Sequence, residues 1–156
     1  CMMYVDLNPI RAGITPSLEQ SDFTSIQQRI REYHQTKIPT QQSSSNTYHF
    51  QLLPFVGGEH QAKKAGINFA FADYLELIDW TGRCIRNDKK GFIAPNQPKI
   101  LQQMGITADA WLEHSEQFMA HYANVSGKWS RMCAFKQHIG GHWCKGKSAS
   151  HQLHPN

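Results

Sequence analysis

Tyr4, Asn8 and Arg11 lie at positions i, i+4 and i+7 of the opening segment, where a helix would place them near one face. A tyrosine oxygen is a nucleophile for phosphoryl transfer, and a neighbouring arginine is suited to hold a phosphate. Because an unperturbed phenol has a pKa of about 10, such a tyrosine needs a base or a metal-polarised phosphodiester near neutral pH. Taken alone, a tyrosine on a short helix more often serves packing than chemistry.

A group of potential metal ligands follows near the C-terminus, where Cys133, His138, His142 and Cys144 form the pattern C-x4-H-x3-H-x-C. Thiolates and imidazoles suit Zn²⁺, and a helix would bring the two histidines onto one face. Two glycines interrupt that helix, and the spacing is not that of a standard zinc finger. The four cysteines show no CxxC pair, so we expect free thiols in a reducing compartment, with zinc binding as the minor alternative.

Other catalytic signatures are missing from the sequence. It contains no P-loop, dinucleotide fingerprint, zincin motif, nucleophile elbow or His-hydrophobic-His pair. Asp73, Glu76 and Asp79 share one predicted helix, and we interpret them as a solvated turn matched to the helix dipole.

The segment from Gly127 to Asn156 is basic, with five cations and no Asp or Glu in a chain of net charge +4. The cations are Lys128, Arg131, Lys136, Lys145 and Lys147. With Trp129 and Trp143 they have the composition for phosphate contact and base stacking. A solvated terminus whose two tryptophans complete a small core explains the same composition, and both interpretations stay open.

Length and composition predict a packed domain, because 156 residues with 40% hydrophobic and 11% aromatic side chains can bury a core. No apolar run approaches the roughly 18 residues of a membrane span, and no basic region leads into an apolar one at the start. We therefore expect a soluble cytoplasmic protein with no membrane partner. The sequence opens with Cys1 inside an expected helix, which we interpret as the cut edge of a longer protein.

The opening segment predicts two short helical turns separated by a kink. Pro9 cannot continue the first turn, whereas Asn8 is a good N-cap for a second turn that runs through Arg11 and stops at Gly13. Apolar side chains recur on the face opposite Tyr4, at Met3, Leu7, Ile10 and Ile14.

Helical spacing of apolar residues recurs along the rest of the chain. It predicts helices over residues 21–35, 73–87, 98–104, 107–123 and 130–139. The first of these would begin at Ser21 or Asp22 and bury Phe23, Ile26, Ile30 and Tyr33, and the 107–123 helix would bury Trp111, Ser115, Phe118 and Tyr122. Residues 49–56 suggest a short strand, although Pro54 favours irregular packing. The pattern as a whole predicts a mainly α protein.

Residues 4–14, YVDLNPIRAGI, resemble the segment Y-[IV]-x-x-N-P-[VI]-[RK]-A-G-[LIVM] of REP-associated tyrosine transposases. This is the single-tyrosine HUH family of bacterial insertion-sequence-like enzymes. SDFTSI at 21–26, LPF at 53–55 and DYLELIDWTGR at 73–83 resemble later segments of longer members, in the same order. The first match is specific and the later ones are weaker.

The resemblance implies that Tyr4 is the nucleophile of DNA transposition. It would attack single-stranded or hairpin DNA, form a 5′-phosphotyrosine link and free a 3′-OH, and a second 3′-OH would reverse the step. The family holds Mg²⁺ or Mn²⁺ with a His-hydrophobic-His pair. Because this chain lacks the pair, we assign it no metal ligand or cofactor and expect it to be inactive alone. The resemblance also allows a homodimer of the intact protein.

The resemblance suggests an organisation into four parts. Residues 1–35 would be the Tyr4 helix and the next helix of a catalytic domain whose ferredoxin-like α/β sheet is otherwise missing, with residues 1–15 exposing an apolar face. Residues 36–48 would be a linker, 49–126 a helical C-terminal extension and 127–156 a basic tail.

DNA is the expected partner, contacted by five basic residues: Arg11, Lys128, Arg131, Lys136 and Lys145. Two alternatives to a transposase fragment stay open. One is a non-enzymatic helical nucleic-acid-binding module or decayed transposase remnant that uses only the basic part. The other is a small zinc-bound interaction domain.

Overall fold

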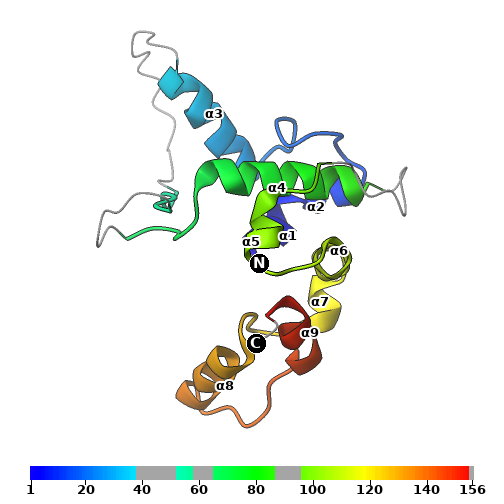
Figure 1. Cartoon of the computed structure of the whole chain (residues 1–156). Helices are drawn as coiled ribbons and strands as arrows, with labels where there is room; N and C mark the ends of the chain where they lie inside the picture. The colour runs from blue at the N-terminus through cyan, green and yellow to red at the C-terminus, as the bar shows by residue number, and fades with distance from the viewer. Residues whose placement is uncertain (38–51, 58–64, 87–95, 155–156) are drawn as a thin grey trace.

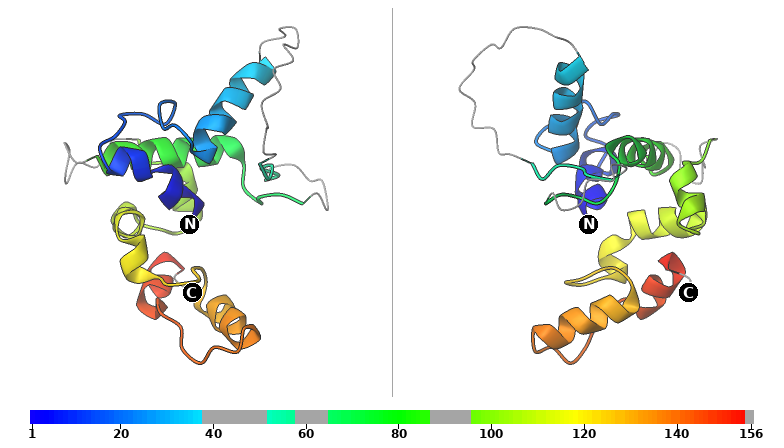
Figure 2. Two further views of the ribbon diagram at one scale, coloured as in Figure 1. Left: turned by 180° about the vertical axis from the view of Figure 1, so that it is seen from behind. Right: turned by 60° about the vertical axis from the view of Figure 1, so that its left-hand side comes forward.

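The computed structural model describes residues 1–37, 52–57, 65–86 and 96–154, and it confirms a mainly α protein (Figure 1). Its helices are α1 (Met2–Asp6), α2 (Asn8–Arg11), α3 (Ser25–Lys37), α4 (Phe71–Cys84), α5 (Lys99–Gln103), α6 (Ala108–Glu116), α7 (Phe118–His121), α8 (Trp129–His138) and α9 (Lys147–Leu153). In every view of Figures 1 and 2, α8 and α9 lie at the end of the molecule opposite α3. None of these helices combines the length and apolar character needed to cross a membrane.

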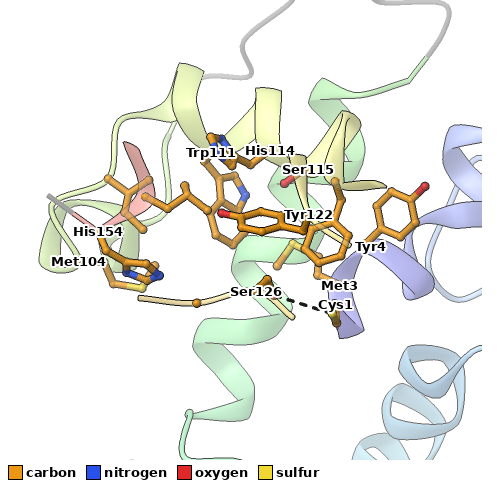
Figure 3. A pocket seen from close by; sticks show the side chains of 14 residues that line it. Cys1, Met3, Tyr4, Met104, Trp111, His114, Ser115, Tyr122, Ser126 and His154 are labelled. Carbon is orange, nitrogen blue, oxygen red and sulfur yellow. Dashed lines mark hydrogen bonds between the residues drawn. The ribbon is translucent and has the colours of Figure 1, made fainter. Parts of the chain in front are cut away.

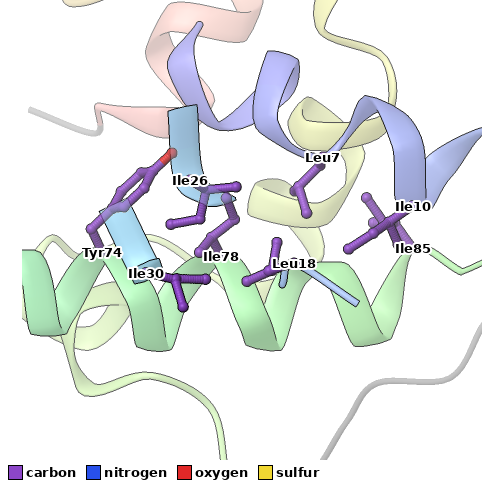
Figure 4. Packing of buried hydrophobic residues seen from close by; sticks show 8 residues of the cluster. All are labelled: Leu7, Ile10, Leu18, Ile26, Ile30, Tyr74, Ile78 and Ile85. Atoms are coloured by element: carbon purple, nitrogen blue, oxygen red, sulfur yellow. The ribbon is translucent and has the colours of Figure 1, made fainter. Parts of the chain in front are cut away.

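The opening turns pack on α4 and do not expose their apolar face. Leu7 and Ile10 are 1% and 4% exposed, and with residues of α3 and α4 they form a first core cluster (Figure 4). The expectation of an exposed apolar face is therefore wrong for these two residues, because α4 covers them. Ile14, 79% exposed, is not part of the buried stripe.

A glycine on α4 makes this close packing possible. A Cβ added at Gly82 would lie 3.2 Å from Leu7 Cδ2 and 3.4 Å from Ile10 Cδ1, so a larger residue there would press on both side chains. The other face of α4 carries Leu77 and Trp80 into a second cluster with Leu101 of α5. Helix α4 is therefore the central element between the two clusters.

The predicted kink is confirmed, but its capping differs from the prediction. Helix α1 ends at Asp6, and α2 follows and stops before Gly13, which has a φ of +70°. Asn8 is the first residue of α2 and makes no side-chain cap, because its Oδ1 accepts a hydrogen bond from Arg11. The prediction that Asn8 is the N-cap of the second turn is therefore wrong.

Helix α3 begins at Ser25 after an N-cap at Thr24, two or three residues later than the predicted cap at Ser21 or Asp22. Phe23 is fully exposed, with a φ of +63°, and belongs to the turn before the helix. Thr24 is the residue that caps the helix, since its Oγ1 accepts a hydrogen bond from the Gln27 amide at 3.3 Å. The predicted start at Ser21 or Asp22 is wrong because Ser21 is buried and donates to the carbonyl of Ser17 at 3.0 Å.

Asp6 joins three helices through one buried carboxylate that is 1% exposed. Its Oδ1 accepts hydrogen bonds from the Ser25 hydroxyl at 2.9 Å and from the Ile26 amide at 3.2 Å, both in the first turn of α3. Its Oδ2 accepts one from the Tyr74 hydroxyl of α4 at 2.8 Å. A carboxylate at a helix N-terminus satisfies amide groups that have no partner within the helix.

The predicted helix over 107–123 is broken at Gln117 into α6 and α7. Thr107 caps α6, and its side chain accepts a hydrogen bond from the Ala110 amide at 3.3 Å. After the break, Phe118 stacks on Tyr4, and Tyr122 joins Met132 and Ala149 in a third core cluster. The break therefore lets one short stretch serve two different packing sites.

The basic segment is folded. Helix α8 matches its prediction, and its end is fixed by the amide of Gly140 donating to the Gln137 carbonyl and that of Gly141 donating to the Lys136 carbonyl. Gly140 has the φ of +71° that this helix-ending motif requires. Helix α9 was not predicted, because its sequence KSASHQL has too few apolar residues to show a period. It contacts α6 through the Ala149 carbonyl and His114, and its Ser150 hydroxyl donates to the carbonyl of Gly127, before α8.

The remaining predicted segments fall partly outside the described ranges. In the described part, residues 52–57 contain no strand, and Phe55 makes one isolated parallel bridge with Ile67, as Pro54 favoured. Of the predicted linker, residues 36 and 37 belong to α3 and the others lie outside the description, as do residues 49–51. The helix predicted over 98–104 matches α5. The one predicted over 73–87 corresponds to α4, which begins at Phe71 and already ends at Cys84, and residue 87 is outside the described part.

Substituting Asp6→Ala should lower the free energy of unfolding by about 3 kcal/mol, because two buried donors and one half-buried donor lose their acceptor. Urea denaturation followed by circular dichroism measures this change. Asp79→Ala is the control, since its pair with Arg83 is exposed and should cost no more than about 0.5 kcal/mol. Equal losses in the two variants would contradict a central role for Asp6.

Alkaline pH should destabilise the fold through Tyr74. Burial, and then the carboxylate of Asp6, raise the pKa of Tyr74 well above its usual value. The unfolded chain releases this proton first, so stability falls as the pH rises above about 10. Tyr74→Phe should remove up to about 1.4 kcal/mol per pH unit of that decline in urea titrations. An unchanged alkaline slope in the variant would refute the assignment.

Candidate functional site

Tyr4 lies on α1 with its ring held by Arg11 of α2. The guanidinium carbon of Arg11 lies 3.8 Å from the centre of the Tyr4 ring, a cation–π contact. Arg11 also donates hydrogen bonds to Asn8 Oδ1 and, at 3.2 Å, to the backbone carbonyl of Ser115 in α6. The structure thus brings together the three residues whose spacing singled them out in the sequence.

The second neighbour of the Tyr4 ring is Phe118 of α7, with 5.3 Å between the ring centres. Tyr4 is half-buried, and its hydroxyl has no hydrogen-bond partner within the described ranges. Figure 3 shows this hydroxyl pointing away from the other labelled side chains. The buried Tyr74 hydroxyl, in contrast, is bound to Asp6, so these two tyrosines serve different purposes.

A cavity of about 230 Å³ lies beside Tyr4, between the opening helix and the segment from α5 to α9 (Figure 3). Its walls are mostly apolar and aromatic, with Trp111, Phe118 and Tyr122 as the large side chains. Ser126 and His154 supply polar groups. Burial, and then the charge of Lys128, lower the pKa of His154, which favours its neutral imidazole.

His114 is buried in the wall of this cavity, and its imidazole connects α6 to α9. Its Nδ1 lies 2.6 Å from the Ala110 carbonyl oxygen, and its Nε2 lies 3.2 Å from the Ala149 carbonyl oxygen. The ring stacks on His121, with 4.6 Å between centres. The sequence analysis missed His114, since a lone histidine in a helical pattern gives no local signal of its partners.

The described residues do not fit a metal ion. They contain no group of three or more His, Cys, Asp or Glu side chains placed to hold one. In the wall of the cavity beside Tyr4, both ring nitrogens of His114 already lie within hydrogen-bond distance of backbone carbonyl oxygens, those of Ala110 and Ala149. Cys144 packs against the third core cluster, while His138 and His142 are exposed, so the structure does not support the zinc hypothesis.

The cations of the basic segment that are predicted to contact DNA differ in how exposed they are to solvent. Lys128 and Arg131 are exposed, and Lys136 and Lys145 are half-buried. The two tryptophans of the basic segment also differ, because Trp129 packs on the third core cluster whereas Trp143 is 70% exposed. Core packing therefore explains Trp129 and leaves Trp143 without a structural role among the described residues.

The carboxylates of α4 match the solvated interpretation. Asp73 lies in the first turn of α4, and Asp79 pairs with Arg83 one turn later at 3.0 Å, with both side chains 55% exposed. Glu76 and Asp79 line a second cavity, of about 440 Å³, together with Glu19 and His34. Because both carboxylates are exposed, we assign them no chemistry.

Comparisons of this chain with protein-family models, with curated proteins and with solved structures found no match.

Substituting Arg11→Ala should lower the free energy of unfolding by about 1 to 2 kcal/mol, because the cation–π contact and the bond to Ser115 are lost together. Arg11→Lys should recover only part of this, since an ammonium has no flat face to stack on the ring. Thermal and urea unfolding measure both. The control is Arg83→Ala, an exposed cation on α4, and a loss as small as this control would contradict the described clamp.

Proposed function

We propose that this chain is part of a DNA transposase of the single-tyrosine class, with Tyr4 as the residue that becomes linked to DNA. The observation that supports it best is the setting of Tyr4: its ring is clamped by Arg11 and Phe118, while its hydroxyl points outward. A nucleophile needs a fixed position and an accessible oxygen. The resemblance of residues 4–14 to the transposase segment supports the same role.

The proposed reaction is a transesterification in which Tyr4 Oη attacks a DNA phosphorus. The Tyr4 O–P bond forms, the P–O3′ bond breaks, the phenol gives up its proton and the leaving 3′ oxygen takes one up. The 5′-phosphotyrosine link keeps the energy of the phosphodiester, so attack by another 3′-OH rejoins DNA without a nucleotide cofactor.

Arg11 is proposed as a positioning residue. It fixes the tyrosine ring and joins α1 and α2 to α6 through the Ser115 carbonyl. A contact from Arg11 to the DNA phosphate would have to share or replace donors that now bind Asn8 and Ser115. Guanidinium groups make such exchanges readily with phosphate, because their paired N–H groups match its oxygens.

The side chains around Tyr4 do not by themselves supply everything that the proposed reaction requires. The family implies Mg²⁺ or Mn²⁺, but the residues near Tyr4 do not fit such an ion, so no step of this proposal uses a metal bound by this chain. We therefore propose that the chain alone is inactive and that it contributes the nucleophile and the binding of DNA. The exposed cations Lys128 and Arg131 support DNA as the partner.

The test uses the complete gene product that contains this chain, incubated with labelled single-stranded DNA and Mg²⁺ or Mn²⁺. A covalent protein–DNA adduct should survive denaturing electrophoresis, and Tyr4→Phe should abolish it. Tyr33→Phe is the matched control, since Tyr33 is 39% exposed on α3 and should be dispensable. An adduct that persists in Tyr4→Phe would exclude Tyr4 as the nucleophile.

A further inference from the structure

Helix α8 has one face packed in the core and one face open to solvent. Met132 is fully buried and Trp129 packs beside it in the third cluster. Beside this packed face Arg131 is exposed, and so are two apolar residues one and two turns later, Phe135 at 42% and Ile139 at 51%. The open face therefore combines a cation with apolar side chains, one of them aromatic.

The segment after α8 carries a second exposed aromatic residue. The two glycine amides that close α8 turn the chain back at its C-terminal end. Trp143 follows directly, in the stretch that joins α8 to α9 at the end of the molecule away from α3 (Figures 1 and 2). At 70% exposure it departs from the usual burial of tryptophan, the largest and most costly apolar side chain to leave in water.

The charge of this region identifies what kind of partner it suits. Between Gly127 and Asn156 the sequence has five Lys or Arg and no carboxylate side chain. Lys128 and Arg131 are exposed, and the segment itself supplies no acidic side chain to neutralise them. A surface of this kind complements a polyanion.

We propose that Lys128, Arg131, Phe135, Ile139 and Trp143, here the α8 face, bind single-stranded DNA, with Trp143 and Phe135 stacking on bases and the cations contacting phosphates. Exposed aromatic rings favour a single strand, because duplex bases are already stacked on one another. This inference rests on the proposed function, since the strand held here would be a flank of the strand cleaved at Tyr4.

Most of the α8 face lies beyond α6 and α7 as seen from α1 (Figure 1). Its start is nearer to Tyr4, because Ser126 and Gly127, directly before Lys128, line the cavity beside Tyr4. A strand held on the part beyond α6 and α7 would therefore be anchored away from the reacting phosphate. Such an anchor would raise the local concentration of the strand at Tyr4 without taking part in the chemistry.

The test measures binding of fluorescent oligothymidylate to the 156-residue chain by anisotropy. Trp143→Ala should weaken binding by about tenfold or more, as expected for loss of one base-stacking side chain. Trp143→Phe should retain part of the affinity and lose the quenching of tryptophan fluorescence by DNA. Phe23→Ala is the control, because Phe23 is an even more exposed aromatic residue that lies outside the basic segment, next to Asp22.

The cations are tested through salt. Arg131→Gln should reduce the slope of log affinity against log salt by about 0.7, the value for one phosphate contact on a single strand. Arg83→Gln should leave the slope unchanged, since Arg83 is on α4 and pairs with Asp79.

Three results would overturn the inference: no binding at low salt, equal affinity in Trp143→Ala, or duplex bound as tightly as single strand. Preferential binding of anionic phosphatidylserine vesicles over DNA would assign the face to a lipid surface instead.

Tyr4→Phe should bind oligothymidylate normally. Failure of the adduct assay with intact binding would therefore reject the role of Tyr4 alone, and loss of binding with an intact adduct would reject the α8 face alone.

Discussion

One buried carboxylate determines how the N-terminal half of this protein is assembled. Asp6 accepts hydrogen bonds from the first turn of α3 and from Tyr74 of α4, so the end of α1 is tied to both helices at once. A buried carboxylate without partners would be strongly disfavoured, and here its partners come from two distant parts of the chain, the start of α3 and the middle of α4. The position of α1, and with it that of Tyr4, follows from this arrangement.

The two faces of α1 and α2 have different roles: one packs in the core and the other carries the candidate nucleophile. Asp6, Leu7 and Ile10 face α3 and α4, where Gly82 leaves room for them. Tyr4 and Arg11 face α6 and α7, and contact Phe118 and the Ser115 carbonyl. The candidate nucleophile is therefore supported by the core without being buried in it. The third core cluster gives α8 and α9 their own packing, which allows the basic surface of α8 to remain exposed.

Local signals predicted the features that depend on neighbouring residues in the sequence. The kink at Pro9, the amphipathic α4 and the end of α8 at Gly140 follow from backbone restriction and helical periodicity. Features that depend on distant partners were missed. In the sequence Asp6 is an ordinary polar residue, because its partners Ser25 and Tyr74 lie far along the chain. The same holds for His114, whose partner Ala149 is 35 residues away. Phe23 fits a helical pattern, yet the capping of α3 by Thr24 leaves it outside.

The central claim, that Tyr4 is the residue of this chain that reacts with DNA, is tested most directly by locating the modification in the linked protein. The complete gene product is allowed to react with single-stranded DNA, digested with nuclease and trypsin, and analysed by mass spectrometry. The account predicts a nucleotide joined through its 5′ phosphate to Tyr4, in the tryptic peptide that ends at Arg11. A phosphonucleotide on any other peptide, or an adduct in which this peptide is unmodified, would contradict it.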